Sequence, residues 1–232
     1  MSGFFGGGGG VVTAQQTKKR VSQFAIDGKD GTTFYLTGTD IVGGPGSAPG
    51  FGAATATQGP FHQRQAGAAT SSGLFFRQQA RVGRNTVCSM FISLGEVTIA
   101  GRSWLGLSDF TNLATQPTTD NPAGNYAAVR FSKVASLDTT FKFITKDNTT
   151  QNIVDTGITP VANTEYRFII TDAGSSWTLT DNTTGLNTVV ATSSANLPLA
   201  GTNLGMFVDV HNPTGAGTML FNVHQLYMES DI

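Results

Sequence analysis

The clearest pattern along the chain is a regular alternation of apolar and polar residues from residue 73 to the carboxyl terminus. In the stretch TEYRFIITD, Tyr166, Phe168 and Ile170 share one face of an extended chain and Arg167 takes the other. Other stretches of strand length follow the same pattern, and most are separated by Gly, Asn, Asp or Pro clusters; they are 73–82, 85–94, 96–108, 125–134, 139–146, 150–156, 175–182, 186–193, 203–211 and 218–229. Roughly ten half-buried antiparallel strands without helical segments between them predict an all-β, two-sheet sandwich.

The alternation also assigns faces to particular side chains. In the last stretch it predicts that Phe221, Val223 and Tyr227 share the buried face. Trp177 has an apolar neighbour two residues along, which favours a place in the core. Trp104 has a glycine at the equivalent position, so both a core site and an exposed sugar-stacking platform stay open.

The first third of the chain has a different composition, rich in Gly, Ala, Thr, Ser and Gln. Two short strands are predicted there, Val21–Ile26 and Thr32–Leu36, joined by the turn sequence DGKDG. The predicted organisation is a Gly-rich docking arm, a leader with a short β-hairpin, and a jelly-roll sandwich, over residues 1–20, 21–72 and 73–232.

Composition and charge exclude several classes of function. Charged residues make up only 12 % of the chain and the net charge is −1, so a nucleic-acid partner is not expected. The single Cys88 cannot form an intrachain disulfide, and mid-strand it is expected to be buried and inert. The sequence has no apolar run of membrane-spanning length and no signal-peptide pattern at its start, which predicts synthesis in a reducing cytoplasm without export or membrane insertion.

No catalytic arrangement is evident in the sequence. A glycosidase of this architecture needs two carboxylates about 5–9 Å apart, and Glu96 has no acidic partner at the required spacing. Glu229 and Asp231 have that spacing but lie at the carboxyl end, where a solvated tail is the simpler interpretation. The chain is therefore predicted not to be an enzyme and to hold no metal or cofactor.

One polar cluster is a candidate ligand site. Asp209, His211 and Asn212 occur together in the sequence DVHNPTG, and loops at the ends of sandwiches often carry function. A metal or glycan site is one interpretation. The alternative is a strand end followed by an Asn-Pro turn.

The opening sequence MSGFFGGGGG predicts an assembly peptide. Glycine permits close backbone approach or strand addition at a sheet edge, while two aromatic residues can be buried as anchors. The residues predicted to dock are Phe4, Phe5, Gly6, Gly7, Gly8, Gly9 and Gly10.

Several stretches resemble a known family. FFRQQARVG, WLGLSD, AAVRFSK, TGITPVANTEYRFIITD and WTLTDNTTGLNTVVATSSANLP occur in an order that resembles concanavalin A-like (laminin-G-like) jelly-roll domains of bacteriophage structural proteins. The segment VSQFAIDGKDGTTFYLTG is similar to a hairpin near the amino ends of phage tail-fibre proteins. The resemblance implies a virion component that decorates the capsid or belongs to the tail, with other virion proteins as partners.

Two further expectations concern partners. The lack of disulfides and the uncharged surface favour a homo-oligomer, with a trimer as the preferred state. The alternative function is a carbohydrate-binding, receptor-recognition module of a tail fibre, with a host surface glycan as its ligand.

Overall fold

The computed structural model describes residues 19–27, 33–37, 50–52, 61–67, 70–76, 80–110, 117–213 and 217–231, and up to residue 65 it describes the backbone. All regular elements in these ranges are β-strands, and every paired strand is antiparallel. Within the same ranges no helix is long and apolar enough to cross a membrane.

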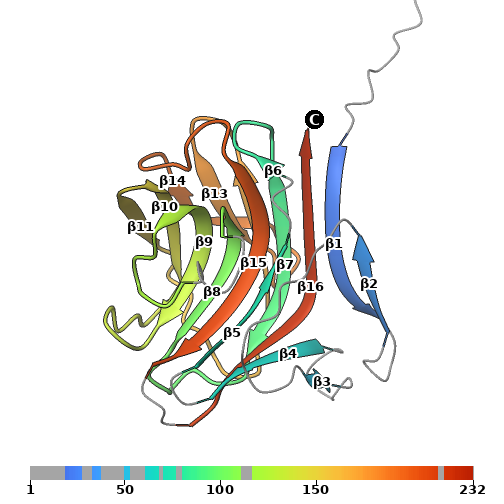
Figure 1. Ribbon diagram of the computed structural model, residues 1–232, viewed down its shortest axis with the longest axis vertical. Helices are drawn as coiled ribbons and strands as arrows, with labels where there is room; N and C mark the ends of the chain where they lie inside the picture. Colours follow the sequence, from blue (N-terminus) through green and yellow to red (C-terminus); the bar gives the residue numbers. More distant parts are fainter. Residues whose placement is uncertain are drawn as a thin grey trace, which may run out of the picture.

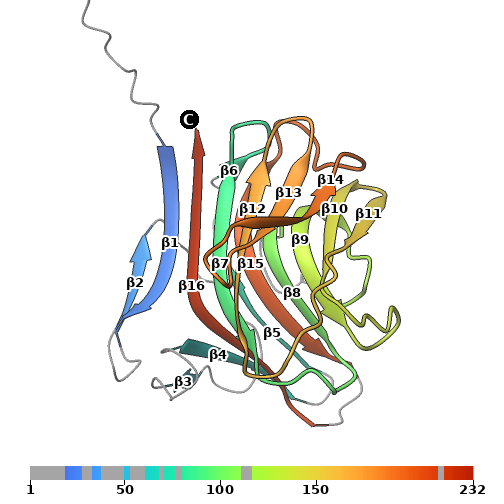
Figure 2. The same cartoon turned by 180° about the vertical axis from the view of Figure 1, so that it is seen from behind.

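A nine-stranded sheet forms one layer (Figure 2). In spatial order its main path consists of β14 (Thr188–Ser193), β13 (Trp177–Asp181), β12 (Glu165–Asp172), β7 (Val87–Leu94), β16 (Met219–Asp231), β1 (Lys19–Asp27) and β2 (Thr33–Thr37). The two remaining strands are β4 (Phe61–Ala66), which pairs with the first part of β16, and β3 (Gly50–Gly52), which pairs with β4.

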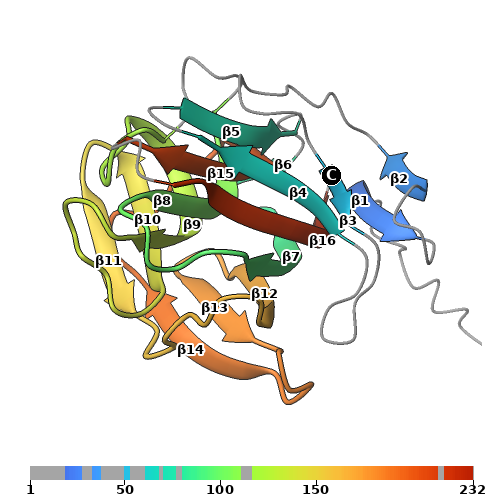
Figure 3. The ribbon, with the colours of Figure 1, turned by 90° about the horizontal axis from the view of Figure 1, so that it is seen from below.

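A seven-stranded sheet forms the other layer. Its path consists of β11 (Gln151–Asp155), β10 (Lys142–Asn148), β9 (Gly124–Ser132), β8 (Arg102–Ser108), β15 (Asn203–Asn212) and β5 (Thr70–Phe75), and β6 (Ala80–Arg81) also pairs with β15. Seen from below, the two sheets lie face to face as a sandwich (Figure 3). The predicted all-β, two-sheet antiparallel architecture is therefore confirmed.

The main hydrophobic core lies between the sheets and follows the predicted alternation. Along β12 the residues alternate between buried and more exposed, with Phe168 and Ile170 fully buried and Arg167 exposed. Trp177 is also fully buried in this core, as its pattern predicted, and the thiol of Cys88 lies in it as well. Burial raises the pKa of that thiol, which keeps it in the unreactive, protonated form.

The alternation predicted for the last strand is wrong in its second half. Phe221 and Val223 face the core, but the register of β16 against β7 shifts between Val223 and Gln225. This β-bulge adds one residue to β16, so Leu226 and not Tyr227 returns to the core. Tyr227 is half-buried on the outer face, where its hydroxyl donates to a Glu229 carboxylate oxygen at 2.7 Å.

The first third of the chain contributes strands to both sheets. The predicted hairpin is confirmed as β1 and β2, and β1 pairs with β16 from Lys19 opposite Asp231 to Ala25 opposite Gln225 (Figure 1). The sequence pattern did not predict β3 and β4, and it placed the start of β5 three residues too late, since that strand begins at Thr70. The predicted docking residues, from Phe4 to Gly10, lie outside the described residues.

Candidate functional site

The outer face of the seven-stranded sheet carries a second hydrophobic cluster. Trp104 on β8 and Tyr126 on β9 meet edge to face, with ring centroids 5.7 Å apart, and both are fully buried. The other members of this cluster are Phe75, Phe110, Ala128, Ile144 and Phe207. Trp104 is thus buried, as one of its two interpretations held, but it lies outside the main core and is not an exposed platform.

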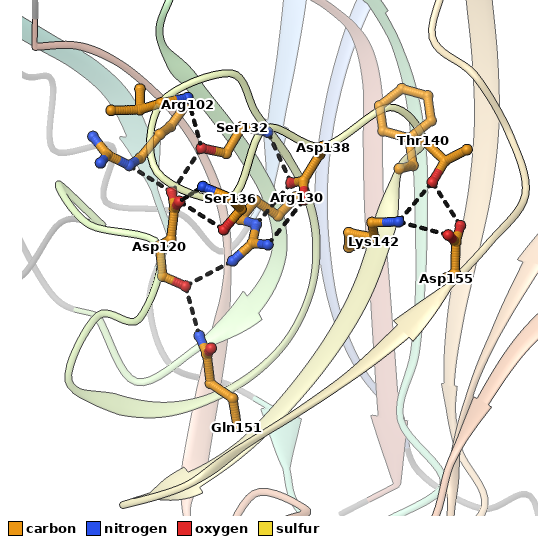
Figure 4. Close-up of polar contacts among 12 residues, drawn as sticks. Arg102, Asp120, Arg130, Ser132, Ser136, Asp138, Thr140, Lys142, Gln151 and Asp155 are labelled. Atoms are coloured by element: carbon orange, nitrogen blue, oxygen red, sulfur yellow. Dashed lines mark hydrogen bonds and ion pairs between the residues drawn. The ribbon is translucent and has the colours of Figure 1, made fainter.

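Residues 117–123, the covering segment, precede β9 and are held against this face by ionic hydrogen bonds. Asp120 accepts a hydrogen bond from Arg102 Nε at 2.6 Å and one from Ser132 Oγ at 2.7 Å (Figure 4). The other carboxylate oxygen accepts from the backbone N–H and the hydroxyl of Ser136, at 2.8 and 2.7 Å. Asp120 therefore joins the segment before β9 both to the sheet and to the loop that follows β9.

Arg130 is the most deeply buried cation on the same face, with a residue exposure of 2 %. Its Nε and Nη2 donate to the two carboxylate oxygens of Asp138 at 3.0 and 3.1 Å, and its Nη1 donates to the backbone carbonyl of Asp120 at 2.8 Å (Figure 4). This bidentate pair is the strong form of the arginine–carboxylate contact. The guanidinium also lies 5.6 Å from the centre of the Trp104 ring, so one residue holds both loops against the aromatic cluster.

The far end of the covering segment is held by Lys146 on β10. Its ammonium donates to Asn121 Oδ1 at 2.7 Å and to the Pro122 carbonyl at 2.6 Å. Gln151 on β11 adds a bond from its side-chain amide to the Asp120 carbonyl at 2.9 Å. Taken together, these contacts close the outer face of the sheet over the aromatic cluster.

The Asp120 contacts make the stability of the fold depend on pH in the acidic range. Burial opposes ionisation of this carboxyl, but hydrogen bonds from Ser132, Ser136 and Arg102 outweigh it and lower the pKa to about 2. A carboxyl whose pKa is lower in the folded than in the unfolded chain stabilises the fold above about pH 4, and this stabilisation is lost as the pH falls towards 2.

We expect Asp120→Asn to lower the free energy of unfolding by about 1–2 kcal/mol at pH 7, after allowance for the partial solvent contact of the segment. The difference between the variant and the parent should shrink as the pH falls from 4 to 2, because the parent then loses the same charge. Urea unfolding of both proteins at several pH values measures this difference in the free energy of unfolding. A difference that stays constant over that range would contradict the ionic origin of the closure.

Of the three predicted ligand residues Asp209, His211 and Asn212, the structure places the first two on one face of β15 and the third apart from them. Asp209 and His211 share the outer face of β15, whereas the Asn212 side-chain amide donates to the Gly217 carbonyl at 3.1 Å. Asp209 is fully buried and lies against Gly73. A Cβ added to Gly73 would be only 2.8 Å from an Asp209 carboxylate oxygen. In the described part of the chain, no three His, Cys, Asp or Glu side chains are grouped so that they could hold a metal ion.

His211 instead has a partner that the sequence did not reveal. Ser71 Oγ on β5 lies 2.6 Å from His211 Nδ1, although the two residues are 140 positions apart. On its other side, His211 is the register partner of Arg102 on β8. Burial, followed by the charge of Arg102, lowers the pKa of the imidazole, so His211 is neutral at pH 7. Ser71 stands in a run of small polar residues, which carries no signal of this contact.

The remaining candidate carboxylates accept hydrogen bonds from groups close to them. One oxygen of Glu96 accepts hydrogen bonds from Val97 and Thr98 in its own turn, which lowers the pKa of the carboxyl. Glu229 and Asp231 belong to β16 and are not a free tail, and Asp231 accepts from the Asn85 side-chain amide at 2.8 Å.

The other two histidines are placed differently. His224 is buried on the nine-stranded sheet, where it stacks on Phe91 with centroids 4.5 Å apart. The side chain of His62 is not among the side chains that the structure describes.

Comparison with known proteins identifies the fold. No protein-family model matches the sequence, and no curated protein matches it as a relative. Among solved structures, the chain is similar to the carbohydrate recognition domain of Emp47p, with a TM-score of 0.61, 9 % identity, and coverage of 91 % of this chain and 96 % of that one. It is also similar to a Bacillus licheniformis β-glucanase, with a TM-score of 0.56, 11 % identity, and coverage of 92 % and 99 %.

A third similar structure is the CBM2 module of an evolved Dit protein of Lactobacillus casei BL23 phage J-1. Its TM-score is 0.52 and its identity 12 %, with coverage of 91 % of this chain and 97 % of that one. With identities this low, the comparisons establish the fold alone. The chain is a concanavalin A-like jelly roll, the architecture that the sequence resemblance implied.

Proposed function

We propose that this chain is a structural component of a bacteriophage virion that docks through its amino-terminal segment and displays the jelly roll. The observation that carries the proposal is the position of β1. This strand adds to the sheet next to β16, and its first residue, Lys19, is opposite Asp231 near the end of the chain (Figure 1). The first described residue thus lies at an end of the sheet and outside the core, a position from which a preceding docking segment would be able to reach a neighbour.

The burial of the aromatic cluster on the outer face of the seven-stranded sheet supports a role without catalysis. In the described residues the face is filled by aromatic rings and covered by loops that Arg102, Arg130 and Lys146 fasten. An enzyme that cleaves a polymer needs an open cleft with a positioned acid and base. One of the similar structures is a module of a phage J-1 protein, which supports the assignment of this jelly roll to a phage.

Deleting Met1–Gly10 is expected to leave the sandwich folded but to abolish incorporation into the particle. Every strand that the structure describes begins at or after Lys19, so the deletion removes none of their ladder hydrogen bonds. The aromatic pair Phe4 and Phe5 would contribute roughly 2–3 kcal/mol of apolar burial each to docking. A pull-down or assembly assay measures incorporation, and circular dichroism confirms that both proteins are folded.

Two milder variants separate docking chemistry from simple loss of length. Replacing Phe4 and Phe5 by Ala should weaken incorporation through lost burial. Replacing Gly7 and Gly9 by Val should impair it by blocking close approach and positive φ angles. Equal incorporation of the truncated and full-length proteins would overturn the proposal and leave the glycines as a passive linker.

A further inference from the structure

The two buried arginines on the outer face of the seven-stranded sheet differ in how their hydrogen-bond donors are used. Arg130 engages Nε, Nη1 and Nη2. Arg102 is 7 % exposed, yet its side chain has one hydrogen bond, from Nε to Asp120, and its Nη1 and Nη2 have no partner among the described residues. Figure 4 shows these terminal nitrogens directed away from Asp120. Neither nitrogen is among the buried, unpaired side-chain atoms of the described residues, so both reach solvent and can bind an acceptor from outside the chain.

His211 offers a second donor at the same place. It is the cross-strand partner of Arg102, and its Nδ1 contacts Ser71 Oγ at 2.6 Å. When the serine hydroxyl donates to Nδ1, the neutral ring carries its proton on Nε2, a tautomer assigned from the hydrogen bond. Nε2 has no partner among the described residues, and the register of β15 against β8 places this imidazole beside Arg102 on the same face of the sheet.

From this arrangement we infer that Arg102 and His211, with Ser71 orienting the imidazole, bind an oxyanion, namely a phosphate or the carboxylate of an acidic sugar. A planar guanidinium fork matches the geometry of both groups. The inference is independent of the proposed docking through the amino-terminal segment, because no residue before Ser71 takes part.

The charges around His211 set how binding depends on pH. Arg102 faces it from β8, Asp209 precedes it by two residues on the same face of β15, and Asp120 lies behind Arg102 on the covering segment. Burial and Arg102 lower the pKa of His211, so its environment already disfavours the imidazolium. An oxyanion held between the two residues would offset the charge of Arg102 and raise that pKa. By linkage, the anion should bind more tightly at a pH low enough to protonate the imidazole than at pH 7.

The test is an NMR titration of the imidazole resonances of the full-length protein. The chain has three histidines, so His62 and His224 are internal controls. We expect saturating phosphate or glucuronate to raise the pKa of His211 by about one unit, which corresponds to a tenfold preference for the imidazolium form. The other two histidines should not move, and glucose and sodium chloride at the same ionic strength should have no effect on any of them.

The two ligands distinguish the source of the anion. A response to glucuronate at lower concentration than to phosphate assigns an acidic sugar, and the reverse order assigns phosphate. No response to either ligand, or equal shifts at all three histidines, would overturn the inference.

Two variants test the residues themselves. Arg102→Gln should abolish the anion-dependent shift and, without any anion, raise the pKa of His211, because the neighbouring charge is gone. His211→Gln keeps both residues of the Arg102–Asp120 contact, and calorimetry at pH 5.5 should show at least tenfold weaker binding of the same anion. Unchanged affinity in His211→Gln would also overturn the inference, even if Arg102→Gln proves unable to fold.

Discussion

Asp138→Ala is expected to lower the free energy of unfolding by about 3–5 kcal/mol, the usual effect of removing one partner of a buried ion pair. The variant leaves the Arg130 guanidinium buried at 2 % exposure without its carboxylate. It also removes the acceptor of the Ser132 backbone N–H, which lies 3.0 Å from Asp138. Urea unfolding of the purified variant at pH 7 measures the loss.

The chain provides a matched control in the pair between Lys142 and Asp155. Its N–O distance is 2.6 Å, but the Asp155 side chain is 58 % exposed. Asp155→Ala should cost about 0–1 kcal/mol, because solvent screens an exposed pair. Similar losses in the two variants would contradict the assignment of Arg130 to a desolvated site.

A double replacement distinguishes the contribution of the ion pair from the contribution of side-chain packing at the same place. Arg130→Met combined with Asp138→Leu removes both charges and leaves no uncompensated ion. It should therefore recover much of the stability that Asp138→Ala loses. If it is as unstable as Asp138→Ala, packing and not charge determines the stability of this region.

The sequence predicted the core well because strand burial has a period of two. Around Phe168 and Trp177 the apolar residues recur at every second position, and nothing interrupts the ladder between β12 and β7. The same rule failed at Tyr227 because a single bulge residue reverses the faces of everything after it. The polar neighbourhood of β16 contains no residue type that marks such a bulge.

The candidate site could be predicted less completely, for a different reason. His211 and Asp209 were found because they stand together in the sequence. The partners of His211, Ser71 and Arg102, come from β5 and β8, and only strand register places them beside it. The covering segment at Asp120 was not predicted either, because its contacts are single hydrogen bonds that leave no periodic pattern.

Two phenylalanines on neighbouring strands lie on opposite faces of the nine-stranded sheet. Phe168 on β12 is fully buried and meets Phe141 edge to face at 5.2 Å between centroids. Phe91 on β7 lies on the outer face, half-buried under the Arg167 guanidinium at 4.4 Å.

Phe168→Ala should destabilise the fold by about 3–5 kcal/mol, because it leaves a cavity among rings that cannot all move inward. For a chain of this size, that loss corresponds to a fall in the melting temperature of roughly 10 °C. Trp177→Ala, in the same core, should behave alike. Phe91→Ala should cost less than half as much, because solvent can fill the space it leaves. Calorimetry of the three variants tests the assignment. If Phe168→Ala or Trp177→Ala melts like the parent but loses binding to a sugar, that aromatic residue is a ligand platform and the core assignment is wrong.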